Sequence, residues 1–249
     1  IKPLSTAEGL NNNNVYALYA DNQHQVWIGM NGGEANIYNT SAGNIHHLSS
    51  KQGLSNNNTF YYGFAEDAHS RKWVSSSGGV DIIDENNGTV KSISAGNGLS
   101  SNSVNYLLTD SRGRIWIKSN GNFPGHKIDV IDEKKGTKKS WGAEQGLFHR
   151  GECNIYEDKQ GQIWTGGPGG GIFILNEETG IIKNASKAQG LKSNNVASLL
   201  EDNEGQIWMG TDKGVDIINV KDGTLKSIIV KELKDFPSYN LLRDSQGNI

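Results

Sequence analysis

Short apolar runs separated by polar turns recur along the chain at a spacing of about 45 residues. Five tryptophans mark this spacing at intervals of 46, 43, 48 and 44 residues. Each lies six residues after an aspartate, in the pairs Asp21–Trp27, Asp67–Trp73, Asp110–Trp116, Asp158–Trp164 and Asp202–Trp208. A sixth copy begins at Asp244, and the sequence ends one residue before its expected tryptophan. Self-similarity of this period predicts a repeat architecture in which each copy is one supersecondary unit.

The fifth copy shows four predicted strands. Val196–Asp202 is a short apolar run that leads through an Asp-x-x-Gly turn into a second strand around Trp208. A glycine-rich connection leads to a β-branched third strand, 215–219, and a hairpin precedes a fourth strand, 224–229. Asp and Gly suit such tight reversals because Asp accepts hydrogen bonds from the turn backbone and Gly adopts positive φ. Four antiparallel strands in about 45 residues make one blade, so the sequence predicts an all-β fold, a β-propeller.

The copies define the predicted domain organisation, a single propeller fragment over residues 1–249. Its repeats fall at approximately 5–48, 49–93, 94–141, 142–185 and 186–230, with a partial repeat at 231–249. Ile1–Leu4 aligns with the fourth strands of later copies, so partial blades are expected at both ends, with 22 strands in all. Twenty-two strands cannot form a closed ring of four-stranded blades, and an open ring would expose unpaired strand edges. We therefore expect the chain to be part of a longer protein with a seven-bladed propeller. Each tryptophan should pack between neighbouring blades.

The composition and charge of the chain limit the classes of function that the sequence can be expected to have. The chain has 249 residues, is 35% hydrophobic and carries a formal charge of −3, which suits a sizeable core and does not favour nucleic-acid binding. The basic run Lys134–Lys139 falls in a predicted hairpin and is interpreted as a solvated turn. No apolar run reaches the ~20 residues needed to cross a bilayer. The single cysteine, Cys153, forms no internal disulfide and is expected to be a small buried hydrophobe. These features leave the compartment open.

The repeat frame G-L-S-x-N-x-V-x-x-L-x-x-D-x-x-G-x-I-W-x-G-T resembles the two-component regulator propeller repeat. The matching stretches are 98–116, 190–211 and, more loosely, 9–29. The frame departs at His24 and Ser70, where glycine is expected, at Glu152 for valine, and across 232–237. The resemblance implies a periplasmic sensor region of a hybrid two-component protein, built of seven-bladed propellers, with an all-β domain, a membrane helix and a histidine kinase elsewhere in the polypeptide. It also implies sensing of oligosaccharides.

The candidate binding site is placed where loops depart from the repeat, because function concentrates in such loops. The third copy is five residues longer than its sisters between its second and third strands, and the extra length falls within the segment 120–127. The following connection, 147–152, and a longer connection in the second copy also deviate. Aromatic rings with charged and amide groups suit sugar recognition by stacking and hydrogen bonding. The candidate ligand-binding residues are Phe123, His126, Phe148, His149, Arg150, Glu152 and Tyr61. Alternatively, these loops cap the rim, and Trp141 is interpreted as a core residue.

Other signals have structural readings. The glycine run 166–171 has no following helix or P-loop lysine, which argues against a phosphate site. His46 and His47 should point to opposite faces of a strand, which argues against shared metal ligation. The Asp-x-x-Gly turns offer too few carboxylates for calcium. A sialidase-like site would need several converging arginines, but all except Arg150 lie in or beside turns between first and second strands, on the opposite rim: Arg71, Arg112, Arg114 and Arg243. The sequence therefore predicts no metal, cofactor or catalytic residue, although Glu34, Glu144 and Glu152 leave a glycosidase reading open.

The sequence-based hypothesis is a non-enzymatic, extracytoplasmic sensor. Its expected partners are an oligosaccharide or another small polar ligand, the remaining propeller blades and the downstream signalling domains. A homodimer is a further partner that this reading allows, and nucleic acid is not expected. Two alternatives remain open: a protein-interaction scaffold and a propeller enzyme such as a polysaccharide lyase or glycosidase. Binding of intact sugar, cleavage of sugar, or capture of a protein partner alone would distinguish the three.

Overall fold

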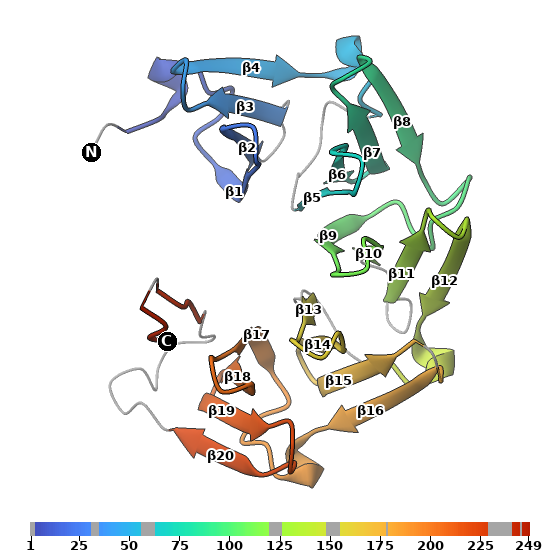
Figure 1. The fold of residues 1–249 in the computed structure, drawn as a ribbon, viewed down its shortest axis with the longest axis vertical. Coiled ribbons are helices and arrows are strands. Elements are labelled where there is room, and N and C mark those ends of the chain that lie inside the picture. Colours follow the sequence, from blue (N-terminus) through green and yellow to red (C-terminus); the bar gives the residue numbers. More distant parts are fainter. Residues whose placement is uncertain are drawn as a thin grey trace. The chain divides into compact units, whose positions relative to one another are not determined.

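The computed structural model describes residues 3–30, 35–55, 63–119, 126–147, 155–177, 179–228, 241–244 and 246–249. In these ranges, twenty strands form five four-stranded antiparallel sheets, each with its strands in sequence order (Figure 1). We call these sheets blades 1 to 5. The predicted all-β class and four-stranded antiparallel blades are confirmed.

The strand bounds follow the repeat. Blade 1 contains β1 (Val15–Ala20), β2 (Gln25–Met30), β3 (Ala35–Asn39) and β4 (Asn44–Leu48); blade 2 contains β5 (Phe64–Glu66), β6 (Lys72–Ser76), β7 (Gly79–Asp84) and β8 (Thr89–Ile93). Blade 3 contains β9 (Val104–Thr109), β10 (Ile115–Ser119), β11 (Lys127–Asp132) and β12 (Thr137–Trp141). Blade 4 contains β13 (Ile155–Glu157), β14 (Ile163–Gly167), β15 (Gly171–Asn176) and β16 (Ile181–Ala185), and blade 5 contains β17 (Val196–Glu201), β18 (Gln206–Thr211), β19 (Gly214–Asn219) and β20 (Leu225–Ile228).

The blades pack in two units. Unit 1 comprises Ile1–Gly121 and Lys127–Ser140, which include blades 1 to 3, and unit 2 comprises Asn122–His126 and Trp141–Ile249, which include blades 4 and 5. Four single-turn 3-10 helices lie in the connections before first strands: η1 (Thr6–Glu8), η2 (Ser50–Gln52), η3 (Ala143–Gln145) and η4 (Lys187–Gln189). Each ends on a glycine at positive φ, which explains the Gly-Leu pair at the start of the repeat frame.

The aspartate that precedes each tryptophan organises the first turn of its blade. In blade 2, one carboxylate oxygen of Asp67 accepts from the backbone N–H of His69 (2.8 Å) and Arg71 (3.1 Å), and the other accepts from Trp73 Nε1 (2.8 Å). The same tryptophan–aspartate bond occurs in all five blades at 2.7–3.0 Å. In the sixth copy, Asp244 binds the same turn amides, and Asn248 Nδ2 donates to it in place of a tryptophan. The turn therefore forms without its tryptophan.

Within each unit, tryptophans pack between successive blades, as predicted. Trp27, Trp73 and Trp164 are 0% exposed. In unit 1, Trp27 packs in one cluster with Phe64 and Val74 of blade 2, and Trp73 with Val104 and Leu107 of blade 3. In unit 2, Trp164 packs with Val196 and Leu199 of blade 5. These three indoles are therefore each shared by two sheets, which ties the stability of one blade to its neighbour.

Blades 1 and 2 also share a buried ionic cluster that the repeat frame does not predict. Lys72 occupies a position that is isoleucine in blades 3 to 5, and its side chain is 1% exposed. Its Nζ lies 2.7 Å from Glu66 Oε2 and 3.4 Å from Asp21 Oδ2. The Tyr19 hydroxyl donates to Glu66 at 3.4 Å, and burial together with the Glu66 charge raises the pKa of Tyr19 to about 12.

The partial blades expected at the two chain ends fall largely outside the described residues, which exclude Ile1, Lys2 and most of the sixth first strand. Of the remaining residues, Pro3, Leu4 and Leu241–Asp244 are not in strands. The twenty described strands are those of the five complete blades, and the total of 22 stays a prediction.

Candidate functional site

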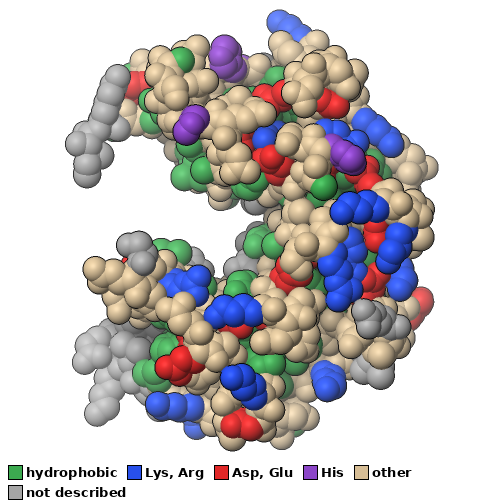
Figure 2. Space-filling view, in the orientation of Figure 1, with side chains coloured by type: hydrophobic (Ala, Val, Ile, Leu, Met, Phe, Trp, Pro, Cys, Tyr) green, Lys and Arg blue, Asp and Glu red, His purple; other side chains and the backbone are tan. Residues whose placement is uncertain are grey.

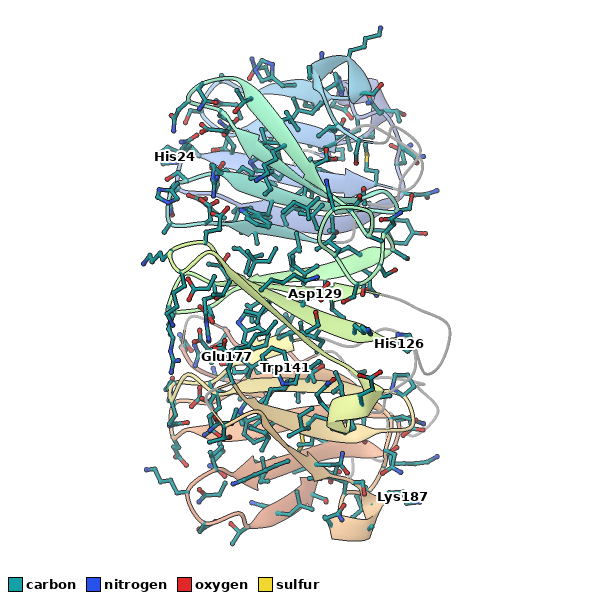
Figure 3. The ribbon with its side chains drawn as sticks, turned by 90° about the vertical axis from the view of Figure 1, so that its right-hand side faces the viewer. His24, His126, Asp129, Trp141, Glu177 and Lys187 are labelled. Atoms are coloured by element: carbon teal, nitrogen blue, oxygen red, sulfur yellow. The ribbon has the colours of Figure 1, made fainter. Side chains whose placement is uncertain are left out.

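Two sets of loops lie at opposite ends of each blade, because the strands are antiparallel. One end carries the hairpins between first and second strands and between third and fourth strands. The other carries the connections between blades and the loops between second and third strands, and we call it the connection rim. In blade 4, Glu177 follows β15 and Lys187 lies in η4, and they appear at opposite ends of the blade (Figure 3). The sequence predicts that the candidate ligand-binding residues lie in segments of the connection rim.

One of the predicted site residues can be placed. His126 lies directly before β11 and is 8% exposed (Figure 3). Phe123, Phe148, His149, Arg150, Glu152 and Tyr61 lie outside the described residues, as does the insertion over 120–125. Their convergence on one ligand stays a prediction. Trp141, interpreted as a core residue, is 3% exposed, which confirms that interpretation.

Buried acids in the third strands hold the connection rim in place. Asp81, Asp129 and Asp216 are each 0% exposed. Asp81 accepts from the backbone N–H of Ser55 (3.1 Å) and from Ser92 Oγ (2.5 Å). An acid of this kind therefore fastens the connection that enters its blade to the fourth strand of that blade. A buried carboxylate requires such donors, since burying an unpaired charge is costly.

The same arrangement recurs in blades 3 and 5, and in neutral form in blade 1. Asp129 accepts from Ser100 N at 2.7 Å and from Ser100 Oγ at 2.6 Å, and also binds Ser140. Asp216 accepts from Lys192 N at 2.8 Å and binds Ser227. Asn36 accepts from Asn11 N at 3.2 Å. Sequence reasoning missed these residues, although an acid inside the β-branched third strands of blades 2, 3 and 5 was a visible signal.

Blade 4 breaks this pattern. Phe173 occupies the acid's position in β15 and is 2% exposed. Asn184, on the neighbouring strand, donates to the carbonyls of Gly170 (2.9 Å) and Ile172 (3.0 Å) instead of to a carboxylate. The connection that enters blade 4 is the deviant segment 147–152. The blade with the most altered connection is therefore also the blade that has exchanged its buried acid for an aromatic ring.

Blade 5 contributes polar groups to the connection rim of unit 2. Asn195 Oδ1 accepts from Gly169 N, and Asn195 Nδ2 donates to Asp212 Oδ2, both at 2.9 Å. Burial would raise the pKa of Asp212, but hydrogen bonds from Ser193 and Asn195 outweigh it and hold the pKa below its usual value. The glycine run of blade 4 thus docks on a blade 5 asparagine, in agreement with its structural interpretation.

The opposite end of unit 1 carries arginines that serve the turns. Arg71 Nε donates to Asp67 at 2.7 Å, and Arg71 also pairs with Glu133. Arg114 Nε donates to Asp110 at 2.6 Å, and its guanidinium carbon lies 5.4 Å from the Trp116 ring centroid. These contacts agree with the prediction that the arginines do not converge as in a sialidase site.

In the described part of the chain, no group of three or more His, Cys, Asp or Glu side chains could hold a metal ion. Over the same residues, no helix has the length and apolar character that a membrane crossing requires.

Comparison with known proteins identifies the repeat. The model of the two-component regulator propeller matches residues 9–32, 98–121 and 190–213. No curated protein matches the sequence.

Solved structures share the fold. The extracellular domain described as part of the hybrid two-component system BT3049 of B. thetaiotaomicron aligns with a TM-score of 0.77 and 21% identity over 96% of this chain and 32% of that one. The corresponding domain of BT4673 from the same organism aligns with a TM-score of 0.71 and 23% sequence identity, over 88% of this chain and 30% of that one. PorZ, a surface component of the type-IX secretion system of Porphyromonas gingivalis, aligns with a TM-score of 0.65 and 13% sequence identity. The alignment covers 88% of this chain and 34% of that one. The chain thus spans about a third of the length of these proteins.

Proposed function

We propose that this chain, which carries two-component regulator propeller repeats, is a ligand-sensing extracytoplasmic region of a two-component signalling protein. The three matched repeats and the structural similarity to two extracellular domains of hybrid two-component systems support the proposal. In this proposal, the chain binds the ligand, and a histidine kinase elsewhere in the polypeptide responds to that binding. Binding transmits a signal only if the ligand favours one arrangement of the sensor over another.

The ligand we propose is an oligosaccharide or a similar polar molecule on the connection rim where blade 4 begins. The observation that carries this placement is Phe173. Four blades fasten the entering connection with a buried Asp or Asn, and blade 4 alone among the five described blades has an aromatic residue there. The segment it would fasten includes Phe148, His149, Arg150 and Glu152, the chemistry expected of a sugar site. Because blade 4 lacks the buried Asp or Asn that fastens this connection in the other blades, we favour a functional role for the loop over a purely structural role in covering the rim.

The test is calorimetry of the longer extracytoplasmic region against a panel of oligosaccharides, with product analysis of the same mixtures. Phe123→Ala and His149→Ala should each weaken binding at least about tenfold, the loss expected for one stacking or hydrogen-bonding contact of about 1.4 kcal/mol. Lys213→Ala is the matched control, since Lys213 is an exposed rim residue of blade 5 outside the candidate site.

Each outcome decides between classes of function. Saturable binding of intact sugar, weakened by the two variants and not by the control, supports the sensor. Cleaved sugar identifies a propeller enzyme instead. A folded protein that binds no sugar, or variants that bind as well as the unmodified protein, would refute this ligand and this site.

A further inference from the structure

One position in the fourth strands distinguishes blade 3 from the other blades. The fourth strands of blades 2, 3 and 5 share the pattern Thr-x-Lys-Ser, in which x is Val90, Lys138 and Leu225. The matching residues of blades 1 and 4 are Ile45 and Ile182. Four blades therefore have an aliphatic side chain at a position where blade 3 has a lysine.

In blades 1, 2 and 5 this aliphatic side chain fills a space beside the connection that enters the blade. A Cβ added at the glycine that ends the turn of that connection would lie 3.6 Å from Ile45, 3.3 Å from Val90 and 3.3 Å from Leu225. In blade 3 the glycine is Gly98, and a Cβ added there would have only Ile93 of β8 within 4 Å. Lys138 therefore leaves this space unfilled.

The connection that enters blade 3 differs from the others as well. It has a turn at 95–98, where the other four connections have a 3-10 helix. Asn97 Oδ1 accepts from Ser94 N at 2.5 Å, which is the bond that a longer Glu or Gln side chain makes in the other connections. Asn97 thus makes the same contact with one methylene fewer. Two separate substitutions, at Asn97 and Lys138, leave room at the same place.

A cavity of about 380 Å³ lies at this place, and all of its lining residues belong to unit 1. Its apolar floor is formed by Ile93 and Ile131, which are partly buried and pack on the core that blades 2 and 3 share. The other walls are Asn97 and Gly98 of the connection and residues of the β11–β12 hairpin. Ligand pockets span ~300–1,000 Å³, so this volume suits a single ring better than a longer chain.

Each of the three charged residues that line the cavity belongs to an ion pair. Glu133 pairs with Arg71, Asp132 lies 3.6 Å from Lys135 Nζ, and Lys138 Nζ lies 3.5 Å from Asp129. Lys138 Nζ also donates to the carbonyl of Gly98. Figure 2 shows Lys and Arg side chains interspersed with Asp and Glu side chains over the part of unit 1 that contains β11 and β12. The cavity wall therefore offers donors and acceptors whose charges are already balanced.

We propose that this cavity, which we call the Lys138 pocket, binds a neutral ring that carries several hydroxyl groups, either a free cyclitol or one unit of a sugar chain. A charged ligand would add an unpaired charge among three ion pairs, whereas a hydroxyl both donates and accepts and leaves the balance unchanged. The C–H face of such a ring covers Ile93 and Ile131 and removes their apolar surface from water. The Lys138 pocket shares no residue with the oligosaccharide site proposed above and does not depend on it.

Saturation-transfer NMR on the longer extracytoplasmic region tests the proposal, with myo-inositol as a free cyclitol, methyl β-glucoside as one unit of a sugar chain, and glucuronate as a charged ring. At least one neutral ring should bind saturably and equally well at low and high salt. Lys138→Leu should weaken that binding at least about tenfold, because it removes a charged donor and fills the space. The fold should accept this change, since blade 5 has Leu225 at that position beside its buried Asp216. Lys226→Leu, the same change at an exposed lysine of β20, is the matched control.

Asn97→Gln provides a second variant, because it restores the residue of three other connections and should also weaken binding. Phe123→Ala should leave binding of the neutral rings unchanged, so a failure of the oligosaccharide site can be distinguished from a failure of the Lys138 pocket. The proposal is overturned if the folded protein binds neither neutral ring saturably, or if Lys138→Leu binds as well as the unmodified protein. Tighter binding of glucuronate than of both neutral rings, lost at high salt, would also overturn it.

Discussion

The ionic cluster between blades 1 and 2 allows a quantitative test, because blade 3 supplies an uncharged residue in place of each partner. Lys72 takes the place of isoleucine in blades 3 to 5, and Glu66 takes the place of Thr109 in blade 3. The perturbation is a double-mutant cycle of Lys72→Ile and Glu66→Thr. Both positions lie in unit 1, and the Nζ–Oε2 distance of 2.7 Å makes this a direct contact.

The magnitudes follow from burial. Glu66→Thr removes the direct carboxylate contact of a lysine that is 1% exposed. It leaves Asp21, 3.4 Å away and already bound to its own turn, and the charge of Glu85, so the variant should cost about 3–5 kcal/mol. Lys72→Ile leaves Glu66 with the Tyr19 hydroxyl and some access to water, and should cost about 1–3 kcal/mol. The double variant reproduces the uncharged pair Thr109 and Ile115 of blade 3 and should be neutral or more stable than the unmodified chain. The expected coupling energy is therefore at least about 3 kcal/mol.

The assay is urea denaturation followed by tryptophan fluorescence at neutral pH, at low and high salt. The coupling should persist at high salt, because buried charges are screened much less than exposed ones. If the effects of the single variants add to that of the double variant within about 0.5 kcal/mol, Lys72 and Glu66 do not interact and the reasoning fails.

Three further predictions concern the turns. His24→Gly should raise the free energy of unfolding by up to about 1 kcal/mol, because His24 has a φ of 62° that glycine adopts without strain, and Gln23→Gly in the same turn should not. Gly171→Ala should destabilise far more than Gly180→Ala in thermal melts, since the added Cβ would lie 2.2 Å from a backbone oxygen in one case and in open space in the other. Burial opposes ionisation of Asp67, but hydrogen bonds from Trp73 and Arg71 hold its pKa below the usual value. The ionised Asp67 should therefore stabilise the fold fully above the unfolded pKa of about 3.9, and this stabilisation should be lost as the pH falls through the lower folded pKa.

Each of these has a contradicting result. Equal or lower stability of His24→Gly would mean that the imidazole makes a contact worth more than the strain. Similar melting temperatures for the two alanine variants would show that blade 4 can shift its fourth strand at little cost. For Asp67, an acid-denaturation curve as steep in Asp67→Asn as in the unmodified chain would exclude that carboxylate as a contributor.

Much of the fold and less of the site could be predicted from the sequence. Strand order, blade boundaries and the Asp–Trp turns follow from residues within about ten positions of one another, so a period in the sequence reveals them. The buried acids were visible as Val-Asp-Ile patterns, but their partners lie 24 to 29 residues away, as in Asp216 to Lys192 and Asp129 to Ser100. Only the tertiary structure shows that these acids fasten the connections that enter blades 2, 3 and 5.

The sequence by itself determined what each blade is: four strands, a glycine-ended turn before the first, and an aspartate that accepts from its own tryptophan six residues later. These features are local, and the backbone can satisfy them blade by blade. Contacts between blades depended on the tertiary structure. That Lys72 meets Asp21 of the preceding blade, or that Leu107 is buried while Leu18 is exposed, depends on which sheet stacks on which. The stacking of two blades depends on many weak contacts spread over a whole sheet face. A short spacing pattern in the sequence therefore does not predict it.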